Sequence, residues 1–264
     1  MDQVTSRIGI LGAGGRMGQA IIAEVQAAGG AQLGGAVEAP GHPALGRSIG
    51  ERGLTIGGNT SALAHDCDVL IDFTAPGALE GNIEAAIAGK TALVIGTTGL
   101  EAAHHHLIDE AAAHIAVLQT ANTSLGVNML AALVRQAAAA LGTDWDIEIV
   151  EMHHRHKVDA PSGTAVMLGE AAAAGRGGAL ADLAERGRDD MDAKRKEGAI
   201  GMAALRGGSV AGDHQVIFAA NGERLELGHR AESREIFARG AVRAALWLSG
   251  RRPDRYSMTD VLGL

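Results

Sequence analysis

Short apolar runs alternate with longer Ala-rich stretches along the first half of the chain. Residues 17–28 and 76–88 carry apolar side chains at helical spacing, as at Ile21 and Val25. Alternating strands and helices are typical of βαβ units, so the sequence predicts a Rossmann-like, doubly wound parallel sheet of the α/β class, covered on both faces. The strands of this sheet are predicted at residues 7–11, 32–38, 68–73, 92–96 and 115–119.

The pattern changes after about residue 125. Strand candidates then follow one another with short links, which favours an inserted α+β domain with a mostly antiparallel sheet. The charged, glycine-rich stretch 175–198 is expected to be a loop, solvated at least over 189–197, and an apolar helix at 238–248 is expected to return to the first domain. The inserted domain spans 125–234, with helices predicted at 131–141 and 164–174 and strands at 146–156, 201–205, 215–218 and 224–227.

Composition narrows the classes of function. With 264 residues the chain can form two domains, and 47% hydrophobic content is ordinary for a globular protein. A net charge of −8 supplies no broad positive field, so we expect no nucleic-acid or membrane partner. The single cysteine, Cys67, excludes an intrachain disulfide and a multi-cysteine metal site. No stretch has the character of a signal peptide or a membrane span, so we expect a cytoplasmic enzyme.

A glycine-rich turn follows the first predicted strand, at Gly12-Ala13-Gly14-Gly15-Arg16-Met17-Gly18. Glycine lets the backbone approach a pyrophosphate closely, and the amides at the start of the next helix then face its negative charge. The spacing is G-x-x-G-x-x-G rather than G-x-G-x-x-G. On its own it is also compatible with a purely structural turn.

The context of this turn favours a dinucleotide. Glu38 ends the second predicted strand, where a carboxylate can accept hydrogen bonds from ribose hydroxyls. The segment Gly96-Thr97-Thr98-Gly99 closes the fourth strand, and Ala121-Asn122-Thr123-Ser124 follows the fifth. Ligands of open α/β sheets bind at the carboxyl ends of the strands, so we predict a nucleotide site there.

The segment from Glu151 to Ala165, EMHHRHKVDAPSGTA, is the densest chemical signal in the chain. If the strand continues to residue 156, His154 and His156 share one face while His153 and Arg155 share the other. Ser162 is a plausible N-cap for the following helix. A lysine, free helix amides and a threonine hydroxyl together form a receptor for a carboxylate, and a histidine moves protons near neutral pH.

Two other interpretations of the histidines stay open. Zinc has suitable spacing at His154 and His156, but no third ligand is indicated and the neighbouring Arg155 and Lys157 oppose a dication, so we expect no metal. A structural role at a domain junction accounts for a single histidine, although poorly for the whole cluster. The separate run 104–106, three histidines in a helical stretch, is interpreted as surface.

These segments resemble the dihydrodipicolinate reductases, now named 4-hydroxy-tetrahydrodipicolinate reductases. The resemblance rests on the 12–18 turn, on Gly96 to Gly99, on the histidine-lysine segment with its Asp159-Ala160-Pro161-Ser162-Gly163-Thr164 continuation, and on Gly240-Ala241-Val242-Arg243 with Trp247-Leu248. It extends over essentially the whole chain, and the histidine-lysine segment is highly specific to that family.

The resemblance implies a dinucleotide-binding domain at 1–124 plus 235–264 and a substrate-binding and oligomerisation domain at 125–234, in a homotetramer. It implies NADH- or NADPH-dependent reduction of 4-hydroxy-tetrahydrodipicolinate, with loss of water, to tetrahydrodipicolinate in lysine and diaminopimelate biosynthesis. By position, His153 is the proton donor and acceptor and Lys157 its catalytic partner. The substrate contacts are His154, Lys157, Gly163 and Thr164. The cofactor contacts are Gly12, Ala13, Gly14, Gly15, Arg16, Met17, Glu38, Gly96, Thr97, Thr98, Ala121, Asn122, Thr123 and Ser124.

Two positions depart from the family pattern. Ala39 stands where many relatives carry a basic residue suited to a 2′-phosphate, so we expect NADH to be favoured or both cofactors to be used. Thr123 stands where relatives often have an aromatic residue, which puts ring stacking on the nicotinamide in doubt. Among other classes, a dinucleotide-sensing binding protein without catalysis predicts damage at His153 or Lys157, and none is seen. A zinc hydrolase predicts metal in the purified protein.

Overall fold

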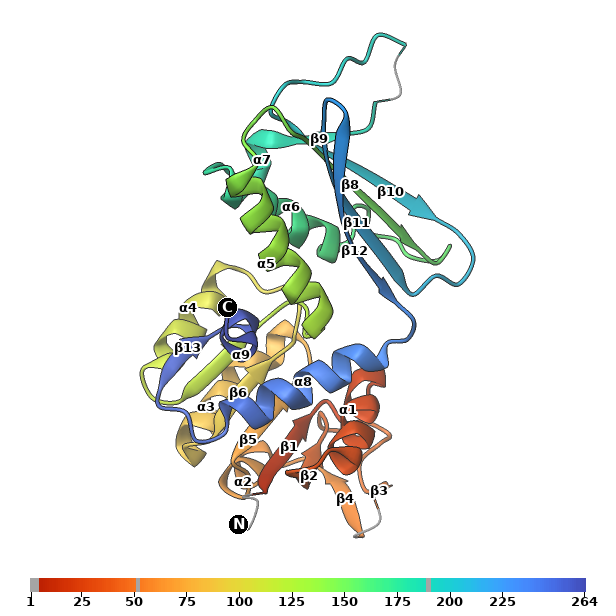
Figure 1. The fold of residues 1–264 in the computed structure, drawn as a ribbon. Helices are drawn as coiled ribbons and strands as arrows, with labels where there is room; N and C mark the ends of the chain where they lie inside the picture. Colours follow the sequence, from red (N-terminus) through yellow and green to blue (C-terminus); the bar gives the residue numbers. More distant parts are fainter. Residues whose placement is uncertain (1–4, 51–52, 189–190) are drawn as a thin grey trace. The chain divides into compact units, whose positions relative to one another are not determined.

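The computed structural model describes residues 5–50, 53–188 and 191–264. The first four residues of the polar N-terminal stretch and the first two of the 189–197 charged run therefore lie outside the described residues. The chain divides into two compact units. The first unit is Met1–Ser124 together with Glu235–Leu264, and the second is Leu125–Arg234 (Figure 1).

The first unit is built on a sheet whose order in the described residues is β13-β7-β6-β5-β1-β2-β4-β3. All its neighbouring strands run parallel except β3 and β4. The predicted Rossmann-like α/β fold is confirmed, and all five predicted strands are present. The strands are β1 (Ser6–Leu11), β2 (Ala31–Val37), β3 (Ser48–Ile49), β4 (Leu54–Gly57), β5 (Val69–Asp72), β6 (Ala92–Ile95), β7 (Ala116–Gln119) and β13 (Asp254–Tyr256).

The helices of this unit form two groups. In one group α1 packs against α8, and α8 also contacts β5, β6 and β7 (Figure 1). The predicted return of the C-terminal helix to the first unit is therefore confirmed. In the other group, α2 packs on α3 and α3 on α4. The helices are α1 (Arg16–Ala27), α2 (Thr60–His65), η1 (Pro76–Ala78), α3 (Leu79–Gly89), α4 (Ala102–Ala112), α8 (Glu235–Leu248) and α9 (Met258–Leu262).

The second unit has a five-stranded sheet in the order β12-β11-β8-β10-β9. β11 is antiparallel to β8 and β12, but β10 is parallel to β8 and β9. The sheet is therefore mixed, and the expectation of a mostly antiparallel sheet is wrong. The connection after β8 contains α6 and returns the chain to the end of the sheet where β8 begins, so β9 and β10 run parallel to β8. The strands are β8 (Asp146–His153), β9 (Ala184–Arg186), β10 (Ile200–Arg206), β11 (Gly212–Ala220) and β12 (Glu223–Ala231).

One face of the second sheet is covered by helices. Both α5 (Leu125–Ala140) and α6 (Gly163–Gly175) contact it and each other, and α7 (Leu180–Leu183) packs on α6. Residues 175–198 are not one continuous loop, because they contain α7 and β9. Aliphatic residues fill the core beneath these helices, and Phe218 is its largest fully buried side chain. Small and aliphatic side chains thus fill this interior despite the 2% aromatic content.

Candidate active site

The glycine turn connects β1 to α1 at the carboxyl edge of the first sheet. The amides of Gly12 and Ala13 donate to the Val37 carbonyl oxygen, each at 3.1 Å. Gly12 has φ +80°, and a Cβ there would lie 2.8 Å from the Phe73 carbonyl oxygen. Gly15 occupies the N-cap of α1 and offers no capping side chain. The start of α1 can therefore present its amides to an anion, as a pyrophosphate requires.

The Glu38 side chain contacts this turn through hydrogen bonds. Its Oε2 accepts from the Gly14 amide at 2.7 Å, and its Oε1 accepts from the Ala39 amide at 2.9 Å. Beside it is a cavity of about 430 Å³, whose lining includes Gly12, Glu38, Ala39, Thr74 and Asn82. A cavity of this size between a glycine turn and a strand-end carboxylate fits the adenosine part of a dinucleotide.

A buried network of polar side chains lies at the carboxyl ends of β5 and β6. The sequence predicted Thr97 as a site residue but none of the other members. Asp72 is fully buried, and its Oδ1 accepts from the Thr74 hydroxyl at 2.6 Å and from the Thr97 hydroxyl at 3.1 Å. Its Oδ2 accepts from the Asn82 amide at 3.0 Å. Asp72 could have been found from the sequence, because it is a polar residue at the end of an apolar strand. The network fixes the course of the predicted 96–98 cofactor loop.

The predicted 121–124 loop follows β7, the strand beside β6, so the structure brings both loops to one sheet edge. The Thr123 side chain is buried, and its hydroxyl donates to the Phe237 carbonyl oxygen at 2.7 Å. The Ser124 amide donates to Asn122 Oδ1 at 2.9 Å. The Thr123 hydroxyl is thus engaged by α8, and the Asn122 and Ser124 amides are held by the side chains of Thr120 and Asn122.

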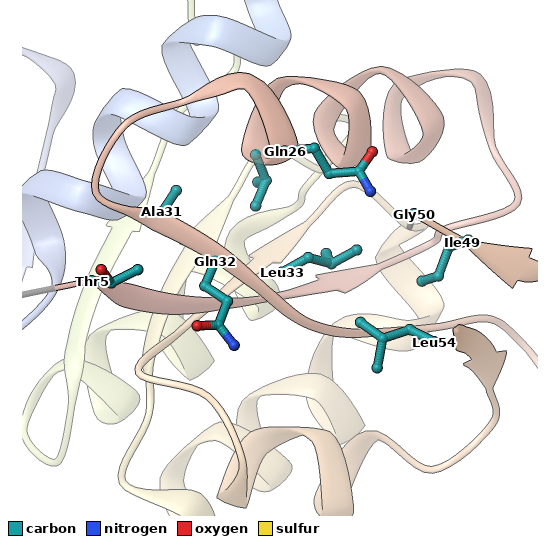
Figure 2. A pocket seen from close by; sticks show the side chains of 9 residues that line it. Thr5, Gln26, Ala31, Gln32, Leu33, Ile49, Gly50 and Leu54 are labelled. Carbon is teal, nitrogen blue, oxygen red and sulfur yellow. The ribbon is translucent and has the colours of Figure 1, made fainter. Parts of the chain in front are cut away.

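A second cavity in this unit has a different position. It measures about 450 Å³ and is lined from α1 by Gln26, from the start of β2 by Gln32 and Leu33, and from β4 by Leu54 (Figure 2). The strand β2 begins here and ends near Glu38, so this cavity lies at the amino end of the strand. Ligands of such sheets bind at the carboxyl ends, and we therefore do not assign the dinucleotide to it.

In the second unit, the strand that carries the histidines is shorter than expected. β8 ends at His153, so residues 154–156 are not a strand and the expected sharing of faces by His154 with His156 is wrong. The chain turns there because the Lys157 amide bonds back to the His154 carbonyl. As a consequence His153 points to the buried face of β8, whereas His156 is exposed.

The predicted substrate residues lie just beyond this turn. Lys157 is half-buried, and its Nζ lies 2.9 Å from Asp159 Oδ1. Ser162 caps α6 as predicted, because its Oγ accepts from the Ala165 amide at 3.2 Å. Gly163 and Thr164 therefore form the first turn of α6, where helix amides favour a carboxylate.

Four side chains gather around His153, and the prediction assigned a role to none of them except Ser162. His153 Nδ1 bonds to the carboxylate of Glu151, and the His214 ring lies edge-on to His153 with centroids 5.0 Å apart. Arg206 lies 2.9 Å from Glu151 Oε1, and Ser162 Oγ lies 3.0 Å from His214 Nε2. The alternation Glu151-x-His153 was a usable signal. Arg206 and His214 lie on other strands, and no local pattern marks them.

The surroundings shift the pKa values of Glu151 and His214. Burial alone raises the pKa of Glu151, but hydrogen bonds from Arg206 and His153 outweigh it, so its pKa is lowered. Burial, followed by the charge of His153, lowers the pKa of His214 to about 4. At neutral pH the cluster therefore holds an ionised Glu151 and a neutral His214.

The same cluster has the donor atoms of a metal site. Ligand atoms of Glu151, His153 and His214 lie within 4.8 Å of one another, and one carboxylate with two imidazoles suits zinc. The guanidinium of Arg206 on the same carboxylate opposes a dication, and the Glu151–His153 bond already uses one imidazole nitrogen. We therefore interpret the cluster as a proton-handling site.

The histidine run on α4 has surface roles, as predicted. His106 is exposed and lies 3.2 Å from Glu110. His104 Nδ1 accepts from the Glu101 amide at 2.9 Å and completes a capping box at the start of the helix. Among the described residues, no helix is both long and apolar enough to cross a membrane.

Comparisons with known proteins cover both units. The family model "Dihydrodipicolinate reductase, N-terminus" matches residues 6–123, and "Dihydrodipicolinate reductase, C-terminus" matches residues 126–262. The 4-hydroxy-tetrahydrodipicolinate reductase of Zymomonas mobilis is 57% identical over 260 residues, 98% of this chain and 97% of the relative. That of Parvibaculum lavamentivorans is 52% identical over 265 residues, 98% of each chain.

Solved structures agree in fold. The dipicolinate-bound dihydrodipicolinate reductase from Paenisporosarcina sp. TG-14 has a TM-score of 0.79 at 21% identity, over 97% of this chain and 98% of that one. A probable dehydrogenase from Thermotoga maritima has a TM-score of 0.62 at 12% identity, over 97% and 92%. Because both halves match the family's own models and full-length relatives are more than half identical, the chain belongs to the dihydrodipicolinate reductase family.

Proposed function

We propose that the chain reduces 4-hydroxy-tetrahydrodipicolinate, with loss of water, to tetrahydrodipicolinate, with NAD(P)H as the reductant. Relatives that are 49–57% identical over nearly the whole chain are named for this activity. The observation that carries the assignment is the buried His153 close in sequence to Lys157 and the N-terminus of α6. These groups supply a proton, a cation and helix amides for a dicarboxylate.

The first unit holds the dinucleotide in this proposal. The glycine turn surrounds the pyrophosphate, which receives the amides of Arg16 and Met17 at the start of α1. Glu38 accepts hydrogen bonds from the adenosine ribose, and the cavity of about 430 Å³ takes the adenosine. The loops at 96–98 and 121–124 bind the remainder. When bound, NAD(P)H supplies the hydride for the reduction.

The second unit holds the dicarboxylate. A substrate carboxylate takes the place of Asp159 on Lys157 Nζ, where it also receives the amides of Gly163 and Thr164. His154 adds a further polar contact. Desolvation and the nearby Arg234 lower the pKa of His154, so it binds mostly as a neutral imidazole.

Reduction of the conjugated imine leaves an enamine-like anion on the substrate, and this anion needs a proton. His153 donates that proton, because its imidazole bonds to Glu151, which also accepts from the Ser162 amide at the start of α6 and so keeps the ring close to the carboxylate receptor. Lys157 stabilises the developing charge as a cation. The chain thus combines acid catalysis with electrostatic stabilisation.

We further propose a homotetramer that works in the cytoplasm, where reduced nicotinamide cofactor is available. The face of the second sheet opposite α5 and α6 supports the assembly, because Val150, Met152 and Ile217 are only partly buried there and Leu205 is 49% exposed. A second copy of this chain would cover that apolar surface. Mass measurement in solution tests the tetramer, and a monomer at micromolar concentration contradicts it.

The test of the reaction is a coupled assay with freshly generated 4-hydroxy-tetrahydrodipicolinate. We expect NAD(P)H oxidation that depends on substrate and persists after dialysis against a chelator. A dinucleotide-sensing binding protein would bind NADH without turnover, and a zinc hydrolase would contain zinc by elemental analysis and would not oxidise NAD(P)H. Either result contradicts the proposal.

A further inference from the structure

Glu151 and His153 lie two positions apart on β8, so both side chains point to its covered face. Glu151 is 1% exposed, and its carboxylate bonds to Nδ1 of His153. A buried carboxylate is costly unless its oxygens are satisfied. Here Oε2 receives His153, while Oε1 lies 2.9 Å from Arg206 and accepts from the Ser162 amide at 3.2 Å. The carboxylate is therefore held in one orientation.

This arrangement distinguishes the two nitrogens of His153. A carboxylate on Nδ1 requires a proton there, which leaves Nε2 as the nitrogen that gives or takes a proton. Gly212 lies beside Nε2, and a Cβ at that position would be 3.0 Å from it. The glycine therefore keeps space open on the reactive side of the ring.

The other groups around His153 complete its electrostatic setting. Arg206 on β10 is paired with Glu151, so its charge is largely neutralised. His214 on β11 lies edge-on to the ring and is neutral near pH 7. Lys157, in the turn after β8, is paired with Asp159. Glu151 is thus the anion in direct contact with the ring.

We infer that Glu151 is a positioning residue for the reduction: it fixes the tautomer of His153, orients Nε2 and stabilises the protonated ring through its negative charge. The inference rests on the proposed function, in which His153 is the proton donor. No proton passes to Glu151 in this scheme. Arg206 and the Ser162 amide act one step further out, by holding the carboxylate.

A purely structural role makes a different prediction. Arg206 also donates to the Asp159 carbonyl oxygen at 2.6 Å and so ties β10 to the loop after β8. If Glu151 served only this connection, its loss would lower the free energy of unfolding. The pH dependence of kcat in the folded enzyme would then be unchanged.

The experiment compares the full-length wild type with Glu151→Gln, Glu151→Asp and Glu170→Gln. Glu170→Gln is the matched control, because it removes the same charge from the exposed surface of α6. For Glu151→Gln we expect kcat to fall by roughly 10²-fold with KM and cofactor Kd unchanged. The rate loss on the basic side of the kcat profile should begin at lower pH, because the imidazolium loses its counter-charge. Glu151→Asp retains the charge and should restore part of both properties.

A second measurement does not depend on activity. The Nδ1 proton shared with a buried carboxylate should give a strongly downfield proton NMR signal in the wild type, assigned by its loss in His153→Gln. We expect this signal in Glu170→Gln and not in Glu151→Gln. A folded Glu151→Gln with unchanged kcat and pH profile overturns the inference, and so does absence of the signal from the wild type. If the wild type lacks reductase activity, the proposed function fails, while the NMR signal still decides the Glu151–His153 pairing.

Discussion

The hydroxyl oxygen of Ser162 lies 3.0 Å from Nε2 of His214, although the two residues are 52 positions apart. Ser162 also caps α6, so its oxygen accepts from the Ala165 amide and its proton is available to the imidazole. The other ring nitrogen, Nδ1, is buried and has no hydrogen-bond partner among the described residues. A protonated His214 would bury a charge that is only partly satisfied, and this explains its lowered pKa.

Acid should therefore destabilise the second unit through His214. Its pKa is about 4 in the folded state against an ordinary 6.5, so the unfolded chain binds more protons between these values. The contribution to stability is complete above pH 6.5 and is lost as the pH falls toward 4, amounting to about 3 kcal/mol at most. Chemical unfolding of wild type and His214→Gln across this range measures it. The variant should show a flatter pH dependence, and identical slopes would contradict the assignment.

Loss of the proposed acid or its cationic partner should affect turnover rather than cofactor binding. His153→Gln and Lys157→Ala are each expected to lower kcat by roughly 10²-fold or more. NADH affinity should barely change, because neither residue lies on the glycine turn or the strand-end loops. His106→Gln, on the exposed surface of α4, is the control. Near-normal turnover of His153→Gln would exclude it as the proton donor.

The carboxylate receptor predicts a specific inhibitor. Pyridine-2,6-dicarboxylate is flat and matches the carboxylate spacing of the substrate, so we expect it to compete with the substrate. Inhibition should weaken in Lys157→Ala, because that variant lacks the cation that now pairs with Asp159 at 2.9 Å. Inhibition constants for both proteins measure the effect. Absence of competition at millimolar concentration would count against a dicarboxylate site.

Cofactor choice should depend on the position after Glu38. The Glu38 carboxylate bonds to the Gly14 and Ala39 amides, which places a negative charge beside the adenosine cavity, and Ala39 adds no cation. The exposed Arg16 at the start of α1 offers some support for a 2′-phosphate, partly offset by Glu38. We expect NADH to be used at least as well as NADPH.

The variant Ala39→Arg should shift the preference toward NADPH by about tenfold, close to the lower end of the 1.5–3 kcal/mol that a hydrogen bond to a charged group contributes, because Glu38 offsets part of the gain. Ala39→Gln is the matched control, because it adds length without charge. The measurement is kcat/KM with each cofactor. A wild-type preference for NADPH above about tenfold would overturn this interpretation.

The contact between α8 and the 121–124 loop should tolerate no larger residue. A Cβ on Gly240 would lie 1.8 Å from the Thr123 carbonyl oxygen, a backbone atom that cannot move aside cheaply. Gly240→Ala should therefore lower the free energy of unfolding by about 1–3 kcal/mol and weaken cofactor binding. In Gly81→Ala, on α3, the added methyl meets no atom within 4 Å, so this control should be neutral or slightly stabilising. Equal stability of the two variants would contradict the close contact.

The local sequence pattern by itself determined most strands of the first unit and several residues of the candidate site. The apolar runs predicted the parallel strands of the first unit, because buried strands need continuous hydrophobic residues. The glycine turn, Glu38, Ser162 and the histidine-lysine segment were marked by residue type and spacing within a few positions. The edge strands β3, β9 and β13 carried too few residues to form a pattern, and β4, with the sequence Leu54-Thr55-Ile56-Gly57, has no continuous apolar run.

Tertiary structure alone decided the surroundings of His153. The sequence placed the histidines on a strand that continued to residue 156, but β8 ends at His153, and only the folded chain shows which ring is buried. The pairing of β8 with β10 and β11 brings Arg206 and His214 beside Glu151, and that pairing depends on the mixed direction of the strands. Proton affinity depends on burial and on charges a few ångströms away. Residues on separate strands supply both, and no local pattern records their distance.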